Sequence, residues 1–252
     1  MTVASTQRHE LAQRHELAEA AHVLARLGLV TAFGHVSARV SGSARVSGRL
    51  LITPAADLAT VTAAAIVDMP LDAGSLPSGA PAEAWAHLAL YRARPDAGSV
   101  ARAQPPGAFA VAAACPALVP LHGQAAWLGE SVPVHDSAHL LRSAELAERA
   151  AACLPAGEAL LLRGNGALTL GATPGIAVAR MWLLAAACDI WLAARAAGHV
   201  TPLTAGEIAS WRAVADELLP RLWQHLRRPA LGEPPVAETS PAVAAPPPTR
   251  PE

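Results

Sequence analysis

The chain has 252 residues, of which 52% are hydrophobic and 15% are charged, and its formal net charge is -1. This length suits one large domain, and the near-neutral charge offers no basic surface for nucleic acid. No apolar run reaches the ~18–20 residues that cross a bilayer, and the N-terminus has no secretory apolar core. Three scattered cysteines, Cys115, Cys153 and Cys188, are typical of a reduced cytoplasmic protein. The low charged fraction predicts that subunit contacts cover part of the surface.

Lysine is absent, so all 19 basic residues are arginines. Schiff-base chemistry on a lysine amine is therefore excluded, both for an aldolase and for pyridoxal phosphate. A Gly-x-x-x-x-Gly-Lys phosphate loop is excluded for the same reason.

Hydrophobic periodicity predicts alternating helices and strands along the chain. Helical patterns cover the first ~28 residues up to Gly28, then 83–93, 109–114, 138–152, 173–197 and 204–226, with an interruption near Pro220. Strand patterns cover 34–40, 49–54, 66–69, the segment around Val100, 132–134, and a hairpin of 159–162 with 167–170.

The first helix contains the hexapeptide QRHELA twice, at 7–12 and 13–18. A shift of six residues turns ~600° around an α-helix, so the two copies face different directions. We interpret the repeat as a duplication that lengthened an exposed end. A metal-binding role is the alternative, but His9 and His15 do not share a face.

The composition changes at residue 229 to Pro, Ala, Glu, Thr and Ser. Such a segment buries too little apolar area to offset its ordering entropy. We therefore predict a domain over 1–228 and a disordered tail over 229–252, with a Pro-rich docking motif as the alternative for the tail.

Several blocks resemble the class II aldolase/adducin family, in that family's order, between about Leu17 and Leu226. They are Gly34 to Arg39, Leu51 to Pro54, Pro81 to Glu83 with His87, Tyr91 and Arg94 to Asp96, the strand that leads to Arg102 and Gln104, and Leu161 to Gly166. The resemblance implies a three-layer α/β/α sandwich with a largely antiparallel central sheet. It also implies a homotetramer with active sites between subunits, where a zinc or manganese ion polarises an oxygen and a glutamate moves a proton.

The chain departs from the family at the three positions where the resemblance places metal-binding histidines. They are occupied by Arg102, Gln104 and Asn165. A guanidinium has no lone pair to donate and repels a dication, while amide oxygens are weak ligands for zinc. We therefore predict no metal cofactor. The alternative is a rebuilt metal site, which would have to recruit His35, His87, His122 or His135.

The resemblance further implies that Glu83 is the catalytic residue. The substrate-binding candidates are Arg102, Gln104, Asn165, His35, Ser37, Arg39 and Thr53. Simpler roles stay open for three residues: Glu83 as a first-turn helix glutamate, Arg102 as its ion-pair partner, and His87 as a core histidine. Pro81 and Ala82 stand where phosphate-binding members often have serines, so we expect an unphosphorylated substrate.

Two functions follow as hypotheses. One is a metal-independent carbon–carbon lyase, decarboxylase- or aldolase-like, or an isomerase, acting on a small carbonyl or carboxylate compound. The other is a non-catalytic protein, either an adducin-like oligomer or a small-acid-binding protein. The enclosure of Arg102 separates them: a guanidinium sealed against Glu83 with no cavity beside it would rule out the enzyme.

Overall fold

The computed structural model describes residues 3–40 and 48–228, and within them an eight-stranded sheet of order β3-β2-β1-β4-β8-β7-β6-β5. All neighbouring strands are antiparallel except β6 and β7, which run parallel. The strands are β1 (His35–Arg39), β2 (Arg49–Ile52), β3 (Val67–Pro70), β4 (Ser99–Ala103), β5 (Ala117–Leu118), β6 (Val132–His135), β7 (Ala159–Leu162) and β8 (Gly166–Gly171).

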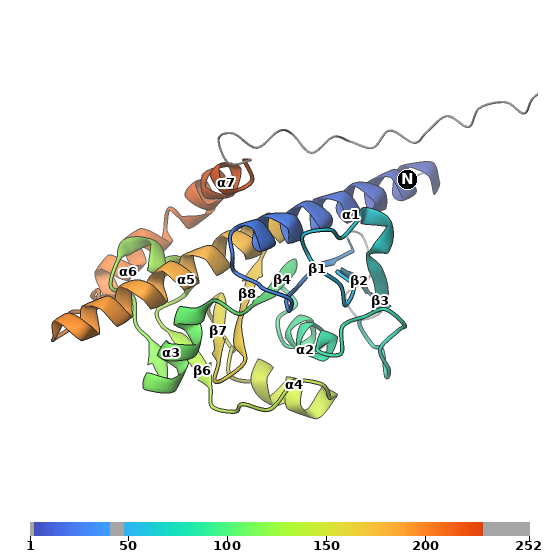
Figure 1. Ribbon diagram of the computed structural model, residues 1–252. Helices are drawn as coiled ribbons and strands as arrows, with labels where there is room; N and C mark the ends of the chain where they lie inside the picture. Colours follow the sequence, from blue (N-terminus) through green and yellow to red (C-terminus); the bar gives the residue numbers. More distant parts are fainter. Residues whose placement is uncertain (1–2, 41–47, 229–252) are drawn as a thin grey trace, which may run out of the picture.

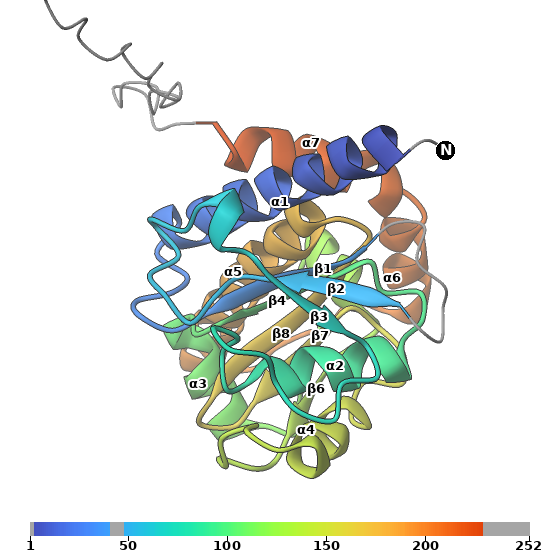
Figure 2. The ribbon, with the colours of Figure 1, turned by 90° about the vertical axis from the view of Figure 1, so that its right-hand side faces the viewer.

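Helices cover both faces of the sheet (Figures 1 and 2). On one face lie α1 (Val3–Arg26), α3 (Pro106–Ala114), α5 (Pro174–Ala197) and α7 (Ala215–Leu226), with α6 (Ala205–Arg212) packed on the 3-10 helix η2 (Gly123–Leu128). On the other face lie α2 (Ala84–Ala93) and α4 (Ala144–Ala151); a second 3-10 helix, η1 (Ala63–Ala65), contacts α1. The predicted three-layer α/β/α sandwich with a largely antiparallel sheet is confirmed.

Strand alternation builds the two cores, because successive side chains point to opposite faces of the sheet. In β4, Ala101 and Ala103 belong to the core under α1 and α5, whereas Val100 belongs to the core under α2 and α4. The same alternation directs Arg102 to the α2 side. The buried cationic residue therefore lies in the layer that also contains the start of α2.

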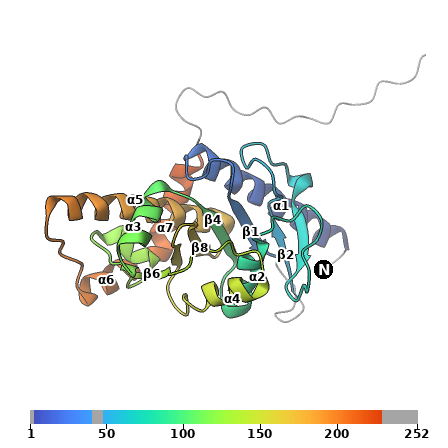
Figure 3. The ribbon, with the colours of Figure 1, turned by 60° about the horizontal axis from the view of Figure 1, so that its bottom comes forward.

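The helix α5 has the length and composition of a membrane span, because an apolar window of 18 residues within it has a mean hydropathy of 1.7. Half of that apolar window is buried inside the protein, where α5 packs on β4, β8, α1 and α3. The helix also carries the charged residues Arg180, Asp189 and Arg195. The core helix of a globular domain has the same properties. The C-terminal part of α5 extends past the sheet (Figure 3).

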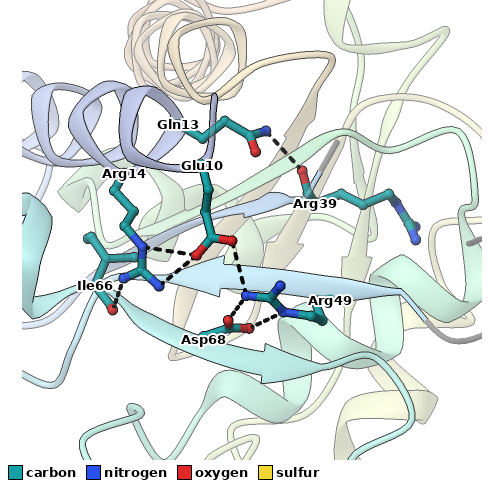
Figure 4. A network of polar contacts seen from close by, with 7 residues as sticks. All are labelled: Glu10, Gln13, Arg14, Arg39, Arg49, Ile66 and Asp68. Carbon is teal, nitrogen blue, oxygen red and sulfur yellow. Dashed lines mark hydrogen bonds and ion pairs between the residues drawn. The ribbon is translucent and has the colours of Figure 1, made fainter. Parts of the chain in front are cut away.

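The two QRHELA copies differ in burial, as expected because they face different directions around α1. Leu17 of the second copy is fully buried, whereas Leu11 of the first is 52% exposed. Glu10 of the first copy accepts a hydrogen bond from Arg14 and forms an ion pair with Arg49 of β2 at 3.3 Å (Figure 4). Arg49 also pairs with Asp68 of β3, so this network fastens α1 to the edge of the sheet.

The structure differs from the predicted elements at several places. The helix expected over 138–152 begins only at Ala144, where the Ser143 hydroxyl caps it by accepting a hydrogen bond from the Leu146 amide. The helix expected over 204–226 breaks before Ala215, and Pro220 lies inside α7. The break follows Trp211, whose carbonyl accepts a hydrogen bond from the Trp127 indole at 2.8 Å. The short strand β5 was not predicted, and the tail over 229–252 lies outside the described residues.

Candidate active site

Five of the predicted site residues line one cavity, and they come from four separate parts of the fold. Arg102 lies near the end of β4 and Gln104 follows that strand, Glu83 immediately precedes α2, and Asn165 is in the turn between β7 and β8. The antiparallel register sets Arg102 opposite His35 of β1, so that His35 lines the cavity as well.

The turn that carries Asn165 requires glycine on both sides. Gly164 and Gly166 have φ of 69° and 89°, in the left-handed region that favours glycine. A Cβ on Gly166 would lie 2.2 Å from the Ala103 carbonyl oxygen of the neighbouring strand. The glycines therefore permit the close approach of β8 and β4 that brings Asn165 to Arg102.

Arg102, Asn165 and Glu83 form a closed polar triangle. Arg102 Nη2 donates to Asn165 Oδ1 at 2.6 Å and lies 3.0 Å from Glu83 Oε2. Asn165 Nδ2 donates to Glu83 Oε1 at 3.2 Å. All three are buried, with exposed fractions of 2%, 3% and 8% for Arg102, Asn165 and Glu83. The ion pair left open as a simpler role for Arg102 is therefore present.

Glu83 lies at the N-cap position of α2, one residue before the helix, and its carboxylate makes no capping hydrogen bond. Both of its oxygens instead contact the triangle. Burial lowers the pKa of Arg102, and the Glu83 charge opposes that change, so the guanidinium remains charged at neutral pH. The triangle holds one cation and one anion out of bulk water.

A cavity of about 700 Å³ opens beside this triangle. Its lining includes Glu83, Arg102, Gln104, Asn165 and His35, and the Gln104 side-chain amide has no hydrogen-bond partner within the described part of the chain. The condition that would have ruled out an enzyme, a sealed pair without a cavity, is therefore not met.

Three other candidates do not line the cavity. Ser37 contacts His87 Nδ1 at 2.7 Å and the Tyr91 hydroxyl at 2.9 Å, in the buried layer between the sheet and α2. Arg39 lies 5.0 Å from the centre of the Tyr91 ring and donates to the carbonyls of Tyr91 and Ala97. Thr53 accepts a hydrogen bond from the Val36 amide.

The reason is the position of the cavity along β1. His35, Ser37 and Arg39 share one face of the strand, as their alternation predicts. Only the His35 end of that face reaches the cavity, because α2 covers the rest. Ser37, Arg39 and Thr53 therefore lie away from this cavity and make hydrogen bonds within the fold. Their substrate-binding role stays a prediction.

His35 and His87 lie against each other with ring centroids 5.8 Å apart. Desolvation by burial, reinforced by Arg102, lowers the pKa of His87 to about 3. Burial, His87 and Arg102 likewise hold the pKa of His35 well below its ordinary value. His35 Nδ1, His87 Nε2, Arg102 Nε and Arg102 Nη1 are buried nitrogens without a hydrogen-bond partner among the described residues.

We expect this histidine pair to make folding sensitive to acid. His87 is neutral when folded and has a pKa of ~6.5 when unfolded, so between pH 6.5 and 3 the unfolded chain binds the extra proton. Stability is therefore lost as pH falls, by about 2 kcal/mol between pH 7 and pH 5 from His87 alone. Urea unfolding at pH 5, 6 and 7 measures the slope.

The matched variants are His87→Gln, which should flatten that slope, and His139→Gln at an exposed position, which should keep it. Equal stability of the wild type at pH 5 and pH 7 would contradict the expectation.

Comparison with known proteins places this chain in a family. Residues 15–192 match the model described as Class II Aldolase and Adducin N-terminal domain. The chain belongs to this family. A comparison with curated proteins finds no match.

Solved structures of class II aldolases share the fold. An aldolase II superfamily protein from Pseudomonas syringae is 26% identical, with a TM-score of 0.72 over 86% of this chain and 91% of that one. The l-fuculose-1-phosphate aldolase from Thermus thermophilus is 27% identical, with a TM-score of 0.66 over 77% and 100%. The L-fuculose 1-phosphate aldolase from Glaciozyma antarctica is 20% identical, with a TM-score of 0.68 over 90% and 92%, which shows the fold alone.

The metal that class II aldolases use does not fit the side chains at this site. Arg102 cannot donate a lone pair, and Asn165 Oδ1 already accepts its hydrogen bond. Within the described ranges, no three His, Cys, Asp or Glu side chains gather as a metal-binding group. His135 contacts Cys153 at 3.5 Å, and neither it nor His122 lines the cavity. The donor set therefore disagrees with a zinc or manganese site.

Proposed function

We propose that this class II aldolase/adducin chain moves a proton at the carbon beside a carbonyl or carboxylate group, without a divalent metal. The reaction would be a carbon–carbon lyase or isomerase step on a small unphosphorylated compound. The observation that carries the proposal is the position of Glu83. It lines a cavity of about 700 Å³, and its carboxylate is held in place by contacts with Arg102 and Asn165.

Each side chain takes a role that its contacts allow. Glu83 is the base, because it is the carboxylate of the triangle and reaches the cavity. Arg102 and Asn165 are positioning residues, since Arg102 Nη2 and the Asn165 side-chain amide contact Glu83 and each other. Gln104 is the oxyanion donor, because its side-chain amide lines the cavity and has no other partner in the described residues.

The strength of such a site limits its chemistry. One positioned donor facing a developing oxyanion contributes about 3–4 kcal/mol. That is enough for an easy proton shift or the decarboxylation of a β-keto acid, and too little for cleaving an unactivated sugar. The Thermus thermophilus relative is named for a phosphorylated substrate. Here Ala55, Ala56, Pro81 and Ala82 line the cavity, and their side chains offer no donor to a phosphate.

Deuterium exchange tests this proposal. 2-Oxobutanoate in D₂O is followed by proton NMR, and we expect the wild type to exchange its C3 protons above the background rate, with or without EDTA. The double variant Glu83→Gln/Arg102→Met, which removes the base without leaving a lone buried charge, should lose at least about 100-fold of that rate. Glu148→Gln, at an exposed position of α4, is the matched control and should exchange normally.

Exchange by the double variant at the wild-type rate would exclude Glu83 as the base. Exchange that disappears with EDTA and returns with zinc would exclude a metal-independent reaction.

A second function is favoured by one feature of the same triangle. Glu83 and Arg102 form a buried ion pair at 3.0 Å, as expected of a purely structural pair. On this alternative, the protein is a non-catalytic, adducin-like homotetramer or a small-acid-binding protein. The wild type would then show no exchange above background.

A further inference from the structure

Among the described residues, Arg142 is an arginine of the cavity lining whose guanidinium has no hydrogen-bond or ion-pair partner. Arg102 also lines the cavity, but its Nη2 serves Glu83 and Asn165, and its Nε and Nη1 are buried. Arg142 lines the same cavity and is exposed. Within residues 3–40 and 48–228 its guanidinium has no hydrogen-bond or ion-pair partner. An anionic ligand in the cavity would therefore meet Arg142 rather than Arg102.

The segment that carries Arg142 is fixed by its own backbone and by a buried neighbour. The Arg142 amide donates to the Leu140 carbonyl at 2.8 Å, and Ser143 caps α4 immediately afterwards. Leu141 is 2% exposed and belongs to the core under α2 and α4. Leu140 and Arg142, on either side of this anchor, both line the cavity. The wall is thus built by a packed turn.

The rest of the wall favours an apolar ligand body. Ala55, Ala56, Pro81 and Ala82 line it, and two large apolar side chains are left open there: Phe33 is 66% exposed and Leu140 is 48% exposed. Asp57 also lines the cavity, and its negative charge would repel a doubly charged phosphate more strongly than a singly charged carboxylate. The volume of about 700 Å³ suits a molecule larger than a three-carbon acid.

We propose that Arg142 is the specificity-determining residue of this cavity. It binds the single carboxylate of an unphosphorylated acid. The apolar or aryl body of that acid packs on the apolar wall formed by Phe33, Leu140, Ala55, Ala56, Pro81 and Ala82. The identification of that acid as a substrate, and of an oxo acid as its class, rests on the function proposed above. The binding itself does not.

Calorimetric titration of the full chain tests the carboxylate contact. The probes are 4-phenylbutanoate, its amide 4-phenylbutanamide, and butanoate. Arg142→Gln should weaken 4-phenylbutanoate binding by at least about tenfold, the loss expected for a charge-assisted hydrogen bond, and should leave amide binding unchanged. Arg149→Gln on α4, where Arg149 is 61% exposed, is the matched control and should bind like the wild type.

The apolar wall is tested with the same probes. Leu140→Ser should weaken 4-phenylbutanoate binding several-fold and leave butanoate binding unchanged, because only the ring reaches the wall. The proposal is overturned if Arg142→Gln binds 4-phenylbutanoate as tightly as the wild type, if the amide binds as well as the acid, or if the wild type binds none of the probes.

These outcomes separate the binding proposal from the catalytic one. Acid binding that depends on Arg142, in a protein without deuterium exchange, leaves the binding proposal standing and removes the catalytic one. Exchange that depends on Glu83, with acid binding indifferent to Arg142, does the reverse.

Discussion

Replacing Arg102 with methionine is expected to lower the free energy of unfolding by about 3–5 kcal/mol, because Glu83 would then be a buried carboxylate without a cation. Arg102 and Glu83 are 2% and 8% exposed and lie 3.0 Å apart. The remaining donor to that carboxylate, Asn165 Nδ2 at 3.2 Å, is neutral and compensates only partly. Urea unfolding followed by circular dichroism measures the loss.

The double variant Glu83→Gln/Arg102→Met should recover most of that loss, because it leaves no unpaired charge. The exposed pair of Arg149 and Glu145, 61% and 80% exposed, is the control, and its Arg149→Met variant should change stability by less than about 1 kcal/mol. The single variants are Arg102→Met and Glu83→Gln. If the stability loss of the double variant equals the sum of their losses, the two charges act independently, contrary to the geometry.

The stability of the double variant also indicates whether the Glu83–Arg102 ion pair is needed for folding. A buried ion pair stabilises a fold little compared with a well-packed apolar pair of the same volume. If the double variant is as stable as the wild type, the pair is not needed for folding. Its contribution would then lie in presenting a fixed carboxylate to the cavity, which is the role that the exchange experiment measures.

Much of the fold could be predicted from the sequence because the dominant signals are local. Strand patterns are visible in the sequences of β1, β4 and the β7–β8 hairpin, and a long apolar helical pattern is visible in α5. Each pattern lies within one element. The errors occurred where distant contacts decide. A strand of two residues such as β5 has no period to detect. At the end of α6, the Trp211 carbonyl accepts a hydrogen bond from Trp127, which is 84 residues away in the sequence.

For the site as well, some features could be predicted from the sequence and others depend on contacts between distant residues. Glu83, Arg102, Gln104, Asn165 and His35 line one cavity, and their catalytic and substrate-binding roles stay predictions. Ser37 and Arg39 share a strand face with His35, but the resemblance that named them gives no information on where along a strand the cavity ends.

Sequence reasoning missed Arg142, because the helix pattern was extended back to residue 138. The available signal was Ser143, a good N-cap residue that indicates a later helix start and a preceding loop.

The duplicated hexapeptide at the N-terminus offers a test in which the residue and its sequence neighbours are the same. We expect Leu17→Ala to lower the free energy of unfolding by about 2–5 kcal/mol, since it empties a site in the core formed by α1, α5 and the sheet. Leu11→Ala, at the same place in the other copy, should change it by no more than about 0.5 kcal/mol, because Leu11 is 52% exposed.

The comparison isolates burial from sequence context, because both leucines follow His-Glu and precede Ala in the same helix. Urea midpoints for the two variants and the wild type measure it. Equal losses would mean that the first copy is also buried, for instance against another subunit, and that α1 is more than the exposed extension inferred from its rotation. A loss confined to Leu17 would show that a duplicated sequence takes its energetic role from its angle around the helix.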